Sequence, residues 1–135
     1  MSSFIWQARV YWEDTDAGGI VYHANYLRFL ERARTEWLRA RGISQRGLAA
    51  DPGIVFSVVA LQVQYLRSAR LDDLLEISCE PRQQGGATLE FSQGIWRVGE
   101  EAQVLLSASV RVACLDAHSM KPRRLPPVIV QNLIA

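Results

Sequence analysis

The sequence predicts an α+β domain in which one long central helix packs against a five-stranded antiparallel sheet. Three observations lead to this fold class. One long helical pattern lies near the N-terminus, four apolar stretches follow it, and the breaks between the last three stretches are short enough for hairpin loops. The 135 residues, of which 49% are hydrophobic and 21% charged, match a single domain over residues 1–135 with one packed core.

The first expected element is a strand from Phe4 to Glu13, in which large apolar and aromatic residues partly alternate. An irregular loop from Asp14 to Ile20 follows this strand. Gly18 and Gly19 lie within the loop and permit backbone angles that other residues avoid. The chain therefore turns sharply before the helix.

The helix is expected to begin between His23 and Asn25, and Gly42 is placed to end it. Apolar residues recur in it at intervals of three and four, which predicts one buried face. These residues are Tyr26, Leu27, Phe29, Leu30, Ala33, Trp37 and Leu38.

Four strands are expected over residues 54–66, 71–82, 87–98 and 102–116. The first is apolar at both alternating sets of positions, so we expect it to be largely covered on both faces. The other three alternate more openly and are expected to pair as an antiparallel meander. A basic segment with prolines then leads to a last apolar turn at 128–134. Since one helix leaves apolar sheet surface uncovered, we expect a homo-oligomer, either a dimer or a dimer of dimers.

Composition excludes several classes of function. The net charge of +1 provides no general attraction for nucleic acid or an acidic membrane surface. No stretch approaches the roughly 18 apolar residues of an integral membrane segment, and no signal-peptide pattern is present, so we expect a cytoplasmic protein. Cys79 and Cys114 lack the close spacing of a metal site or redox pair and are interpreted as buried thiols.

Three acidic residues, Glu13, Asp14 and Asp16, raise the question of a Mg²⁺ or Ca²⁺ site. If the strand continues to Asp14, Glu13 and Asp14 point to opposite faces, and no calcium-loop spacing follows. We therefore expect no metal and no cofactor. Solvation and local turn bonding are the ordinary roles for these acids.

Asp16 has two interpretations, since it lies at the turn between strand and helix. It is either an Asx turn or helix cap, or a reacting carboxylate. In the second interpretation the first amides of the helix bind a developing oxyanion, because they lack acceptors within the helix and carry partial positive charge. A carboxylate beside a helix start amounts to a workable acyl-transfer site.

His23 is a candidate base because its ordinary pKa lies near neutrality. A catalytic triad has little support, since the sequence contains no GxSxG nucleophile elbow. His23 is therefore expected to contribute its backbone amide, with its ring serving orientation or substrate contact.

The stretch RVYWEDTDAGGIVYHANYLRFLERART resembles the signature of hotdog-fold acyl-CoA thioesterases of the 4-hydroxybenzoyl-CoA thioesterase family. The segments YLRSARLDDLLEI and MKPRRLP are similar to the branch associated with the Tol-Pal cell-envelope operon of Gram-negative bacteria. The resemblance runs from about Arg9 to Pro126. It implies a hotdog fold, dimers and often tetramers, and acyl-CoA hydrolysis without a metal.

Carried onto this chain, the resemblance places the catalytic carboxylate on Asp16 and the amide that polarises the thioester carbonyl on His23. It places the active site at a dimer interface, with the acyl group near the helix and CoA along a surface channel. Gly19, Tyr22 and Asn25 fall within the signature as substrate-binding candidates, and capping is a further role for Asn25.

Two departures from the family pattern bear on the substrate. Hydroxybenzoyl-specific members have proline after the catalytic Asp and tryptophan at the position of Tyr22, whereas this chain has Ala17 and Tyr22, which weakens the case for an aromatic substrate. A sister branch uses an acid and a threonine on the helix. Glu31 and Thr35 have that spacing, but charged neighbours favour a solvated face for Glu31.

Five basic residues are the candidates for binding the CoA phosphates: Arg67, Arg70, Lys121, Arg123 and Arg124. Arginine can bind phosphate through two parallel hydrogen bonds. A solvated basic surface remains the alternative for each of them.

The leading hypothesis is hydrolysis of an acyl-CoA, or of an acyl group on acyl carrier protein, to a free acid and a thiol. Asp16 acts either as a nucleophile through a mixed anhydride or as a general base on water. Two alternatives remain open. One is a hotdog dehydratase or hydratase, and the other is a non-catalytic protein that binds acyl carriers or an envelope complex.

Overall fold

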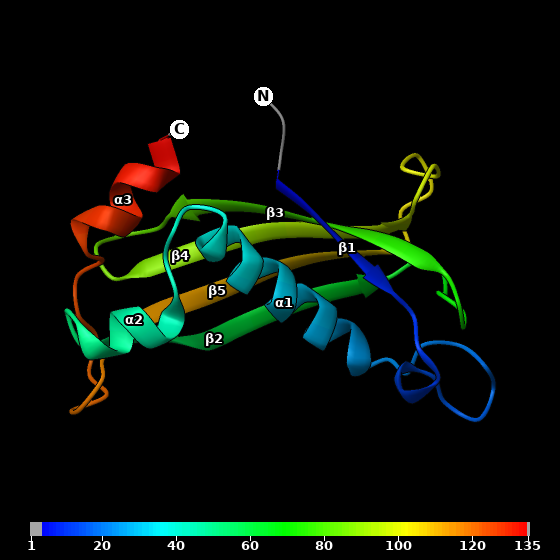
Figure 1. Ribbon diagram of the computed structural model, residues 1–135, viewed down its shortest axis with the longest axis horizontal. Coiled ribbons are helices and arrows are strands. Elements are labelled where there is room, and N and C mark those ends of the chain that lie inside the picture. Colours follow the sequence, from blue (N-terminus) through cyan, green and yellow to red (C-terminus); the bar gives the residue numbers. More distant parts are fainter. Residues whose placement is uncertain (1–3, 135) are drawn as a thin grey trace.

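The structure, a computed structural model, describes residues 4–134. Its elements in chain order are β1 (Phe4–Arg9), a 3₁₀ turn (Trp12–Asp14), α1 (Asn25–Arg39), α2 (Gln45–Ala50), β2 (Ile54–Tyr65), β3 (Leu74–Gln83), β4 (Thr88–Arg97), β5 (Leu106–Asp116) and α3 (Pro127–Ile134). Figure 1 shows two layers, with α1 lying across one face of the sheet. The predicted α+β architecture is therefore confirmed.

The five strands form one sheet in the order β1-β3-β4-β5-β2, and every neighbouring pair is antiparallel. Strands β3, β4 and β5 form the expected meander. The two strands that precede it in the chain lie at its two edges, so β2 has a free edge within the described chain.

The core lies between α1 and the sheet. Alternate residues of β3, Leu75, Ile77 and Cys79, are buried on the side that faces the helix. Trp37 on α1 meets Phe91 on β4 edge to face, with ring centroids 6.2 Å apart. Burial of this apolar surface is the main favourable term that holds the two layers together.

The predicted end of the first strand and the predicted environment of β2 were wrong. The first strand ends at Arg9 instead of Glu13, because the chain turns into the 3₁₀ turn at Trp12. Strand β2 was expected to be covered on both faces, yet most of its residues from Val58 onward are exposed. It lies at the sheet edge, where α1 does not cover it fully.

Two short helices were not anticipated. Ser44 caps α2 by accepting a hydrogen bond from the Gly47 amide at 3.0 Å. The terminal apolar segment forms α3, whose Ile129 is buried in the core. None of the described helices is long and apolar enough to cross a membrane.

Candidate functional site

The loop before α1 is held in a tight turn at Asp16. The Asp16 amide donates to Ile20 O at 2.9 Å, and the Gly19 amide donates to Asp16 O at 3.1 Å. Gly19 has a φ of 82°, a conformation that favours glycine. One carboxylate oxygen of Asp16, Oδ1, accepts from the Gly18 amide at 2.8 Å. The Asx turn considered from the sequence is therefore present, and it fixes the orientation of the Asp16 carboxylate.

The same loop is attached to the connection between β2 and β3. The Val21 amide donates to Ala69 O at 2.9 Å, and Ile20 forms a bridge with Arg70. The Ala69 amide in turn donates to the hydroxyl of buried Tyr26 at 2.9 Å. Burial raises the pKa of Tyr26, which keeps this hydroxyl neutral. The loop and the start of α1 are thus fixed to the same connection between β2 and β3.

Asp14 lies beneath this loop and is only 6% exposed. Its carboxylate accepts hydrogen bonds from the Tyr11 amide at 2.8 Å and from Asn25 Nδ2 at 3.0 Å. The expected turn bonding is present, but the expected solvation of this acid is wrong. Asn25 is buried as well and does not cap the helix, since Ala24 occupies the cap position. The side-chain amide of Asn25 donates a hydrogen bond to Asp14 instead.

His23 lies two residues before Asn25, the first residue of α1. Within the described residues, the amide of His23 donates no hydrogen bond. The His23 carbonyl accepts from the Tyr65 hydroxyl at 2.8 Å, which holds the peptide between His23 and Ala24 against the end of β2. The His23 ring packs at 4.5 Å from the half-exposed ring of Tyr22. A free amide at the positive end of a helix can bind an anion.

A hollow of about 280 Å³ brings these groups together. Its lining residues are Asp16, Ile20, Val21, His23, Tyr26, Tyr65, Leu66, Arg67 and Ser68. A carboxylate, a helix-start residue and a guanidinium thus share one surface. That combination suits a substrate with a polarisable carbonyl and a nearby negative charge.

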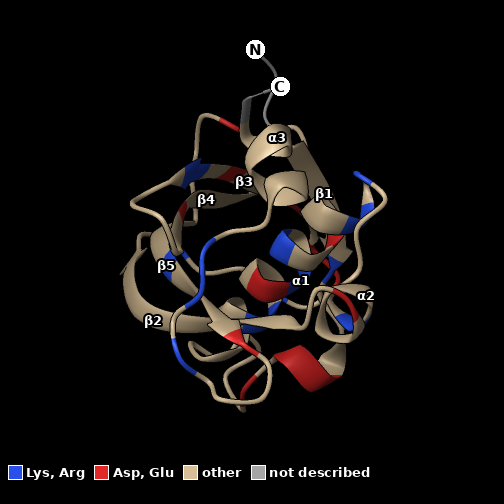
Figure 2. Ribbon diagram, turned by 90° about the vertical axis from the view of Figure 1, so that its left-hand side faces the viewer, with Lys and Arg blue, Asp and Glu red and all other residues tan. Residues whose placement is uncertain are grey.

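The five basic candidates do not lie together in the chain. Arg67 lines the hollow and donates to Val104 O at 3.1 Å, and Arg70 follows it in the same connection. The segment with Lys121, Arg123 and Arg124 lies at the opposite end of β2, beyond Ile54 and Asp116. β2 begins at the left-hand end of the molecule in Figure 1, which is the end that faces the viewer in Figure 2. A strand of twelve residues separates the two groups by roughly 36 Å. Within one chain, the five candidates therefore form two separate groups.

Arg123 also has a local role in the turn before β2. Its Nη1 donates to Pro52 O at 2.9 Å and to Gly53 O at 3.1 Å, and it lies 3.5 Å from a carboxylate oxygen of Asp116. Lys121 and Arg124 are exposed. Of these three residues, Arg123 is the one that is held in place.

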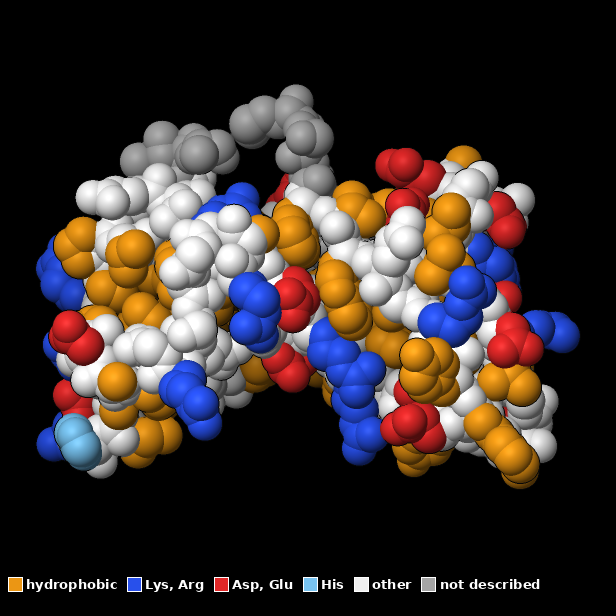
Figure 3. All heavy atoms as spheres, viewed as in Figure 1, with side chains coloured by type: hydrophobic (Ala, Val, Ile, Leu, Met, Phe, Trp, Pro, Cys, Tyr) orange, Lys and Arg blue, Asp and Glu red, His pale blue; other side chains and the backbone are white. Residues whose placement is uncertain are grey.

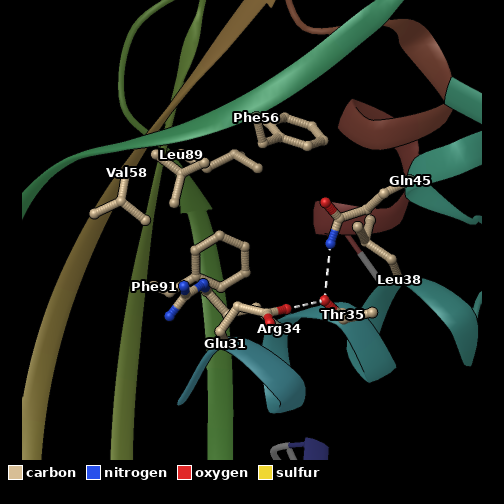
Figure 4. A pocket seen from close by; sticks show the side chains of 10 residues that line it. Glu31, Arg34, Thr35, Leu38, Gln45, Phe56, Val58, Leu89 and Phe91 are labelled. Carbon is tan, nitrogen blue, oxygen red and sulfur yellow. Dashed lines mark hydrogen bonds between the residues drawn. The ribbon is translucent and has the colours of Figure 1, made fainter. Parts of the chain in front are cut away.

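Glu31 and Thr35 line a second cavity (Figure 4), although Glu31 is exposed, as its charged neighbours predicted. The Thr35 hydroxyl donates to Glu31, and Gln45 Nε2 on α2 donates to Thr35 Oγ1 at 2.8 Å. Glu31 itself is exposed, at the rim. The cavity of about 140 Å³ lies between α1, α2 and the sheet, and its other lining residues are Arg34, Leu38, Phe56, Val58, Leu89, Phe91 and Val112.

Neither cysteine takes part in either site. Cys79 and Cys114 are buried and free, as the sequence indicated. Burial raises the pKa of the Cys79 thiol to about 12, despite opposing effects of Arg34 and Arg41. Such a thiol is protonated at neutral pH and a poor nucleophile. Over residues 4–134, no group of three or more His, Cys, Asp or Glu side chains is arranged to hold a metal ion.

Comparison with known proteins gives a consistent result. A family model described as the thioesterase superfamily matches residues 18–103. Acyl-CoA thioester hydrolase YbgC of Escherichia coli O6:H1 is 50% identical over 127 residues, which cover 94% of this chain and 92% of the relative. Acyl-CoA thioesterase YbgC of Haemophilus influenzae is 45% identical over 125 residues, covering 93% and 90%. The crystal structure of a probable thioesterase from Bartonella henselae is 39% identical, with a TM-score of 0.86 and coverage of 93% and 100%.

Proposed function

Because the chain belongs to the thioesterase superfamily, we propose that it hydrolyses acyl-CoA thioesters in the hollow at the start of α1. Asp16 is the reacting carboxylate, and the His23 amide is the donor to the oxyanion. The observation that carries this assignment is that Asp16 and His23 line one hollow while the His23 amide lacks an acceptor within the described residues.

The two oxygens of Asp16 have different roles in this proposal. Oδ1 is held by the Gly18 amide, whereas Oδ2 accepts no hydrogen bond from the described residues. Oδ2 is therefore the oxygen available for chemistry. The Asx turn and the catalytic role are compatible, because the turn orients the carboxylate without occupying both of its oxygens.

Two routes use this geometry. In the first, Asp16 Oδ2 attacks the thioester carbon, the carbon–sulfur bond breaks, and the departing thiolate takes up a proton from water. Water then hydrolyses the mixed anhydride, which releases the free acid and restores the Asp16 carboxylate. In the second, Asp16 takes a proton from water as the water oxygen adds to the same carbon, and the proton passes to the departing thiolate. In both, the His23 N–H donates to the carbonyl oxygen as negative charge develops on it. Each route yields a free acid and CoA thiol.

The phosphate-bearing part of CoA is assigned to the basic residues. Arg67 and Arg70 lie nearest the hollow in the same chain. Guanidinium groups bind phosphate through paired hydrogen bonds. Substrate contacts by Gly19, Tyr22 and Asn25 remain proposals. For Asn25, the contact competes with the hydrogen bond to Asp14.

We also propose that two copies of the chain associate through the free edge of β2. The residues exposed along and just after this strand include several large apolar ones: Val58, Val59, Leu61, Tyr65 and Leu66. Figure 3 shows further apolar side chains exposed at the end of the molecule where Figure 1 places the loop before α1. An unpaired apolar edge favours strand addition by a second copy.

Such a dimer would also bring the two groups of basic candidates close together. If two β2 edges pair antiparallel about a two-fold axis, the Ile54 end of one strand approaches the Tyr65 end of the other. The segment with Lys121 and Arg124 of a second copy then lies toward the hollow of the first. The CoA site would be complete only in the dimer.

A thiol-release assay across short, long and aromatic acyl-CoAs tests the proposed function. We expect CoA thiol and free acid in equal amounts. Mass spectrometry separates this outcome from a dehydratase or hydratase, which changes the acyl group by one water and releases no thiol. Absence of thiol from every acyl-CoA would contradict the proposal and favour a binding protein.

A further inference from the structure

Strand β2 exposes apolar side chains on the face that it shares with the core. Val58, Leu61 and Tyr65 are 48%, 40% and 50% exposed. Their antiparallel partners on β5 are buried core residues, Val112, Val110 and Leu106. Directly opposed residues of antiparallel strands lie on the same face of the sheet, so all six side chains point toward the α1 layer. We call Val58, Leu61 and Tyr65 the apolar strip.

Each end of the apolar strip reaches one of the two hollows described above. Tyr65 lines the hollow that contains Asp16, and Val58 lines the cavity between α1 and α2. Along α1, the rise from Asn25, its first residue, to Thr35 is about 15 Å. The apolar strip itself spans roughly 20 Å along β2, slightly shortened by the irregular register between Val58 and Ala60. The strip thus connects the thioester position to the cavity over a distance far longer than a short acyl group.

The polar side chains of the cavity are already bonded to protein groups. Figure 4 shows Gln45 directed at Thr35, which donates in turn to Glu31. Arg34 donates to Gln93 Oε1 at 3.1 Å. What remains for a ligand is the apolar part of the wall, which includes Phe56 and Phe91. Such a wall suits a hydrocarbon end, because a methyl group needs no hydrogen-bond partner.

We propose that the apolar strip and this cavity bind the hydrocarbon of a long, unbranched acyl group whose thioester lies at Asp16. The inference rests on the proposed function and adds its substrate class. A short acyl group or a single ring at the thioester would leave both the strip and the cavity empty. A long chain would cover the half-exposed side chains of Leu61 and Val58, and each buried methylene would tighten binding by up to about fourfold.

Binding of non-hydrolysable CoA thioethers tests this inference. The probes are the S-butyl, S-octyl and S-dodecyl thioethers of CoA, titrated into the wild-type protein, Val58→Trp and Gln62→Trp. The indole at position 58 would occupy the entrance to the cavity. Gln62 is the matched control, since it lies on the same strand opposite Ser109 and points to the other face.

For the wild-type protein and Gln62→Trp, we expect affinity to rise steadily from S-butyl to S-dodecyl. Val58→Trp should bind the S-butyl thioether as the wild type does and lose at least about tenfold for S-dodecyl, because several methylenes lose their contacts. Equal affinity for all three lengths would overturn the inference. Equal weakening by Val58→Trp at every length would also overturn it.

The proposed dimer pairs β2 through its backbone edge, whereas the apolar strip lies on the sheet face toward α1, so the strand can take part in both. A second copy that also covers the strip is the competing occupant. Sedimentation of Val58→Trp distinguishes the two. If the substitution dissociates an oligomer while leaving the length dependence of binding intact, the strip belongs to the interface and the inference is wrong. Because the thioethers are not hydrolysed, their binding is measured separately from thiol release by acyl-CoA. Length-dependent binding of the thioethers without thiol release from acyl-CoA would contradict only the proposed function. Thiol release from acyl-CoA without length-dependent binding would contradict only the inference.

Discussion

The side-chain amide of Asn25 donates a hydrogen bond to the carboxylate of Asp14 at 3.0 Å, and both side chains are only 6% exposed. This contact joins the first residue of α1 to the turn that precedes the Asp16 loop. The carbonyl of Asp14 also accepts from the Tyr22 amide at 3.0 Å, next to His23. Asp14 therefore helps to fix the helix start relative to Asp16.

Asn25→Ala should destabilise the protein. The substitution leaves a buried carboxylate with one donor fewer, so we expect the free energy of unfolding to fall by about 2–3 kcal/mol. Urea unfolding measures this change. Glu13→Ala is the control, because Glu13 is exposed and its removal should change stability by no more than about 0.5 kcal/mol. Equal effects of the two substitutions would contradict a structural role for the contact.

Gly18→Ala should impair turnover more than folding. An added Cβ would lie 3.3 Å from Asp16 Oδ1, closer than most such contacts, and would displace the carboxylate. We expect kcat to fall on the order of tenfold, since a small displacement of a reacting group lowers the reaction rate strongly. The control is Gly86→Ala, whose added Cβ would meet nothing within 4 Å. A kcat for Gly18→Ala equal to that of the control would show that the position of Asp16 is unimportant.

The Cys79 thiol should make stability depend on alkaline pH. Burial raises its pKa from 9.0 to about 12, so the unfolded chain loses this proton at lower pH than the folded one. The contribution of the raised Cys79 pKa to the free energy of unfolding is fully present below pH 9 and declines as the pH rises toward 12. We expect wild type to lose about 1.4 kcal/mol more than Cys79→Ser between pH 8 and pH 10. If urea unfolding gives the same pH dependence of the free energy of unfolding for wild type and Cys79→Ser, this prediction is wrong.

A charge at the free edge of β2 should dissociate the proposed dimer. Val59→Lys places two like charges close together if the β2 edges pair about a two-fold axis. We expect sedimentation to give a dimer for the wild type, a monomer for this variant, and a higher KM for acyl-CoA in the monomer. Val98→Lys, at another exposed apolar position away from β2, is the control. A wild-type monomer with full activity would exclude the composite site.

The sequence predicted most of the fold because each main element has a local pattern. The spacing of Phe29, Ala33 and Trp37 identifies one helix face, and alternation through Leu75 and Ile77 identifies a strand, without knowledge of what they contact. These patterns determine which face is buried. They do not determine how far a neighbouring layer extends, which is why the exposure of β2 was missed.

The candidate site was harder to predict, because its geometry depends on contacts between distant residues. The burial of Asp14 follows from its contact with Asn25, eleven residues later, which no local pattern encodes. The separation of Arg67 from Arg123 follows from strand register. The contact of Gln45 with Thr35 in the second cavity could not be predicted, because Gln45 lies on α2, a helix too short to have a strong periodic pattern. The tight turn at Asp16 was foreseeable, since its glycines are adjacent in sequence.

The most direct test of the central claim is the kcat of Asp16→Asn for CoA thiol release. Asparagine keeps an oxygen that can accept from the Gly18 amide but is neither a competent nucleophile nor a base, so the fold and thioether binding should persist. We expect kcat to fall at least about hundredfold relative to wild type and to the control Glu13→Gln. If Asp16→Asn turns over as fast as Glu13→Gln, the catalytic assignment of Asp16 is wrong.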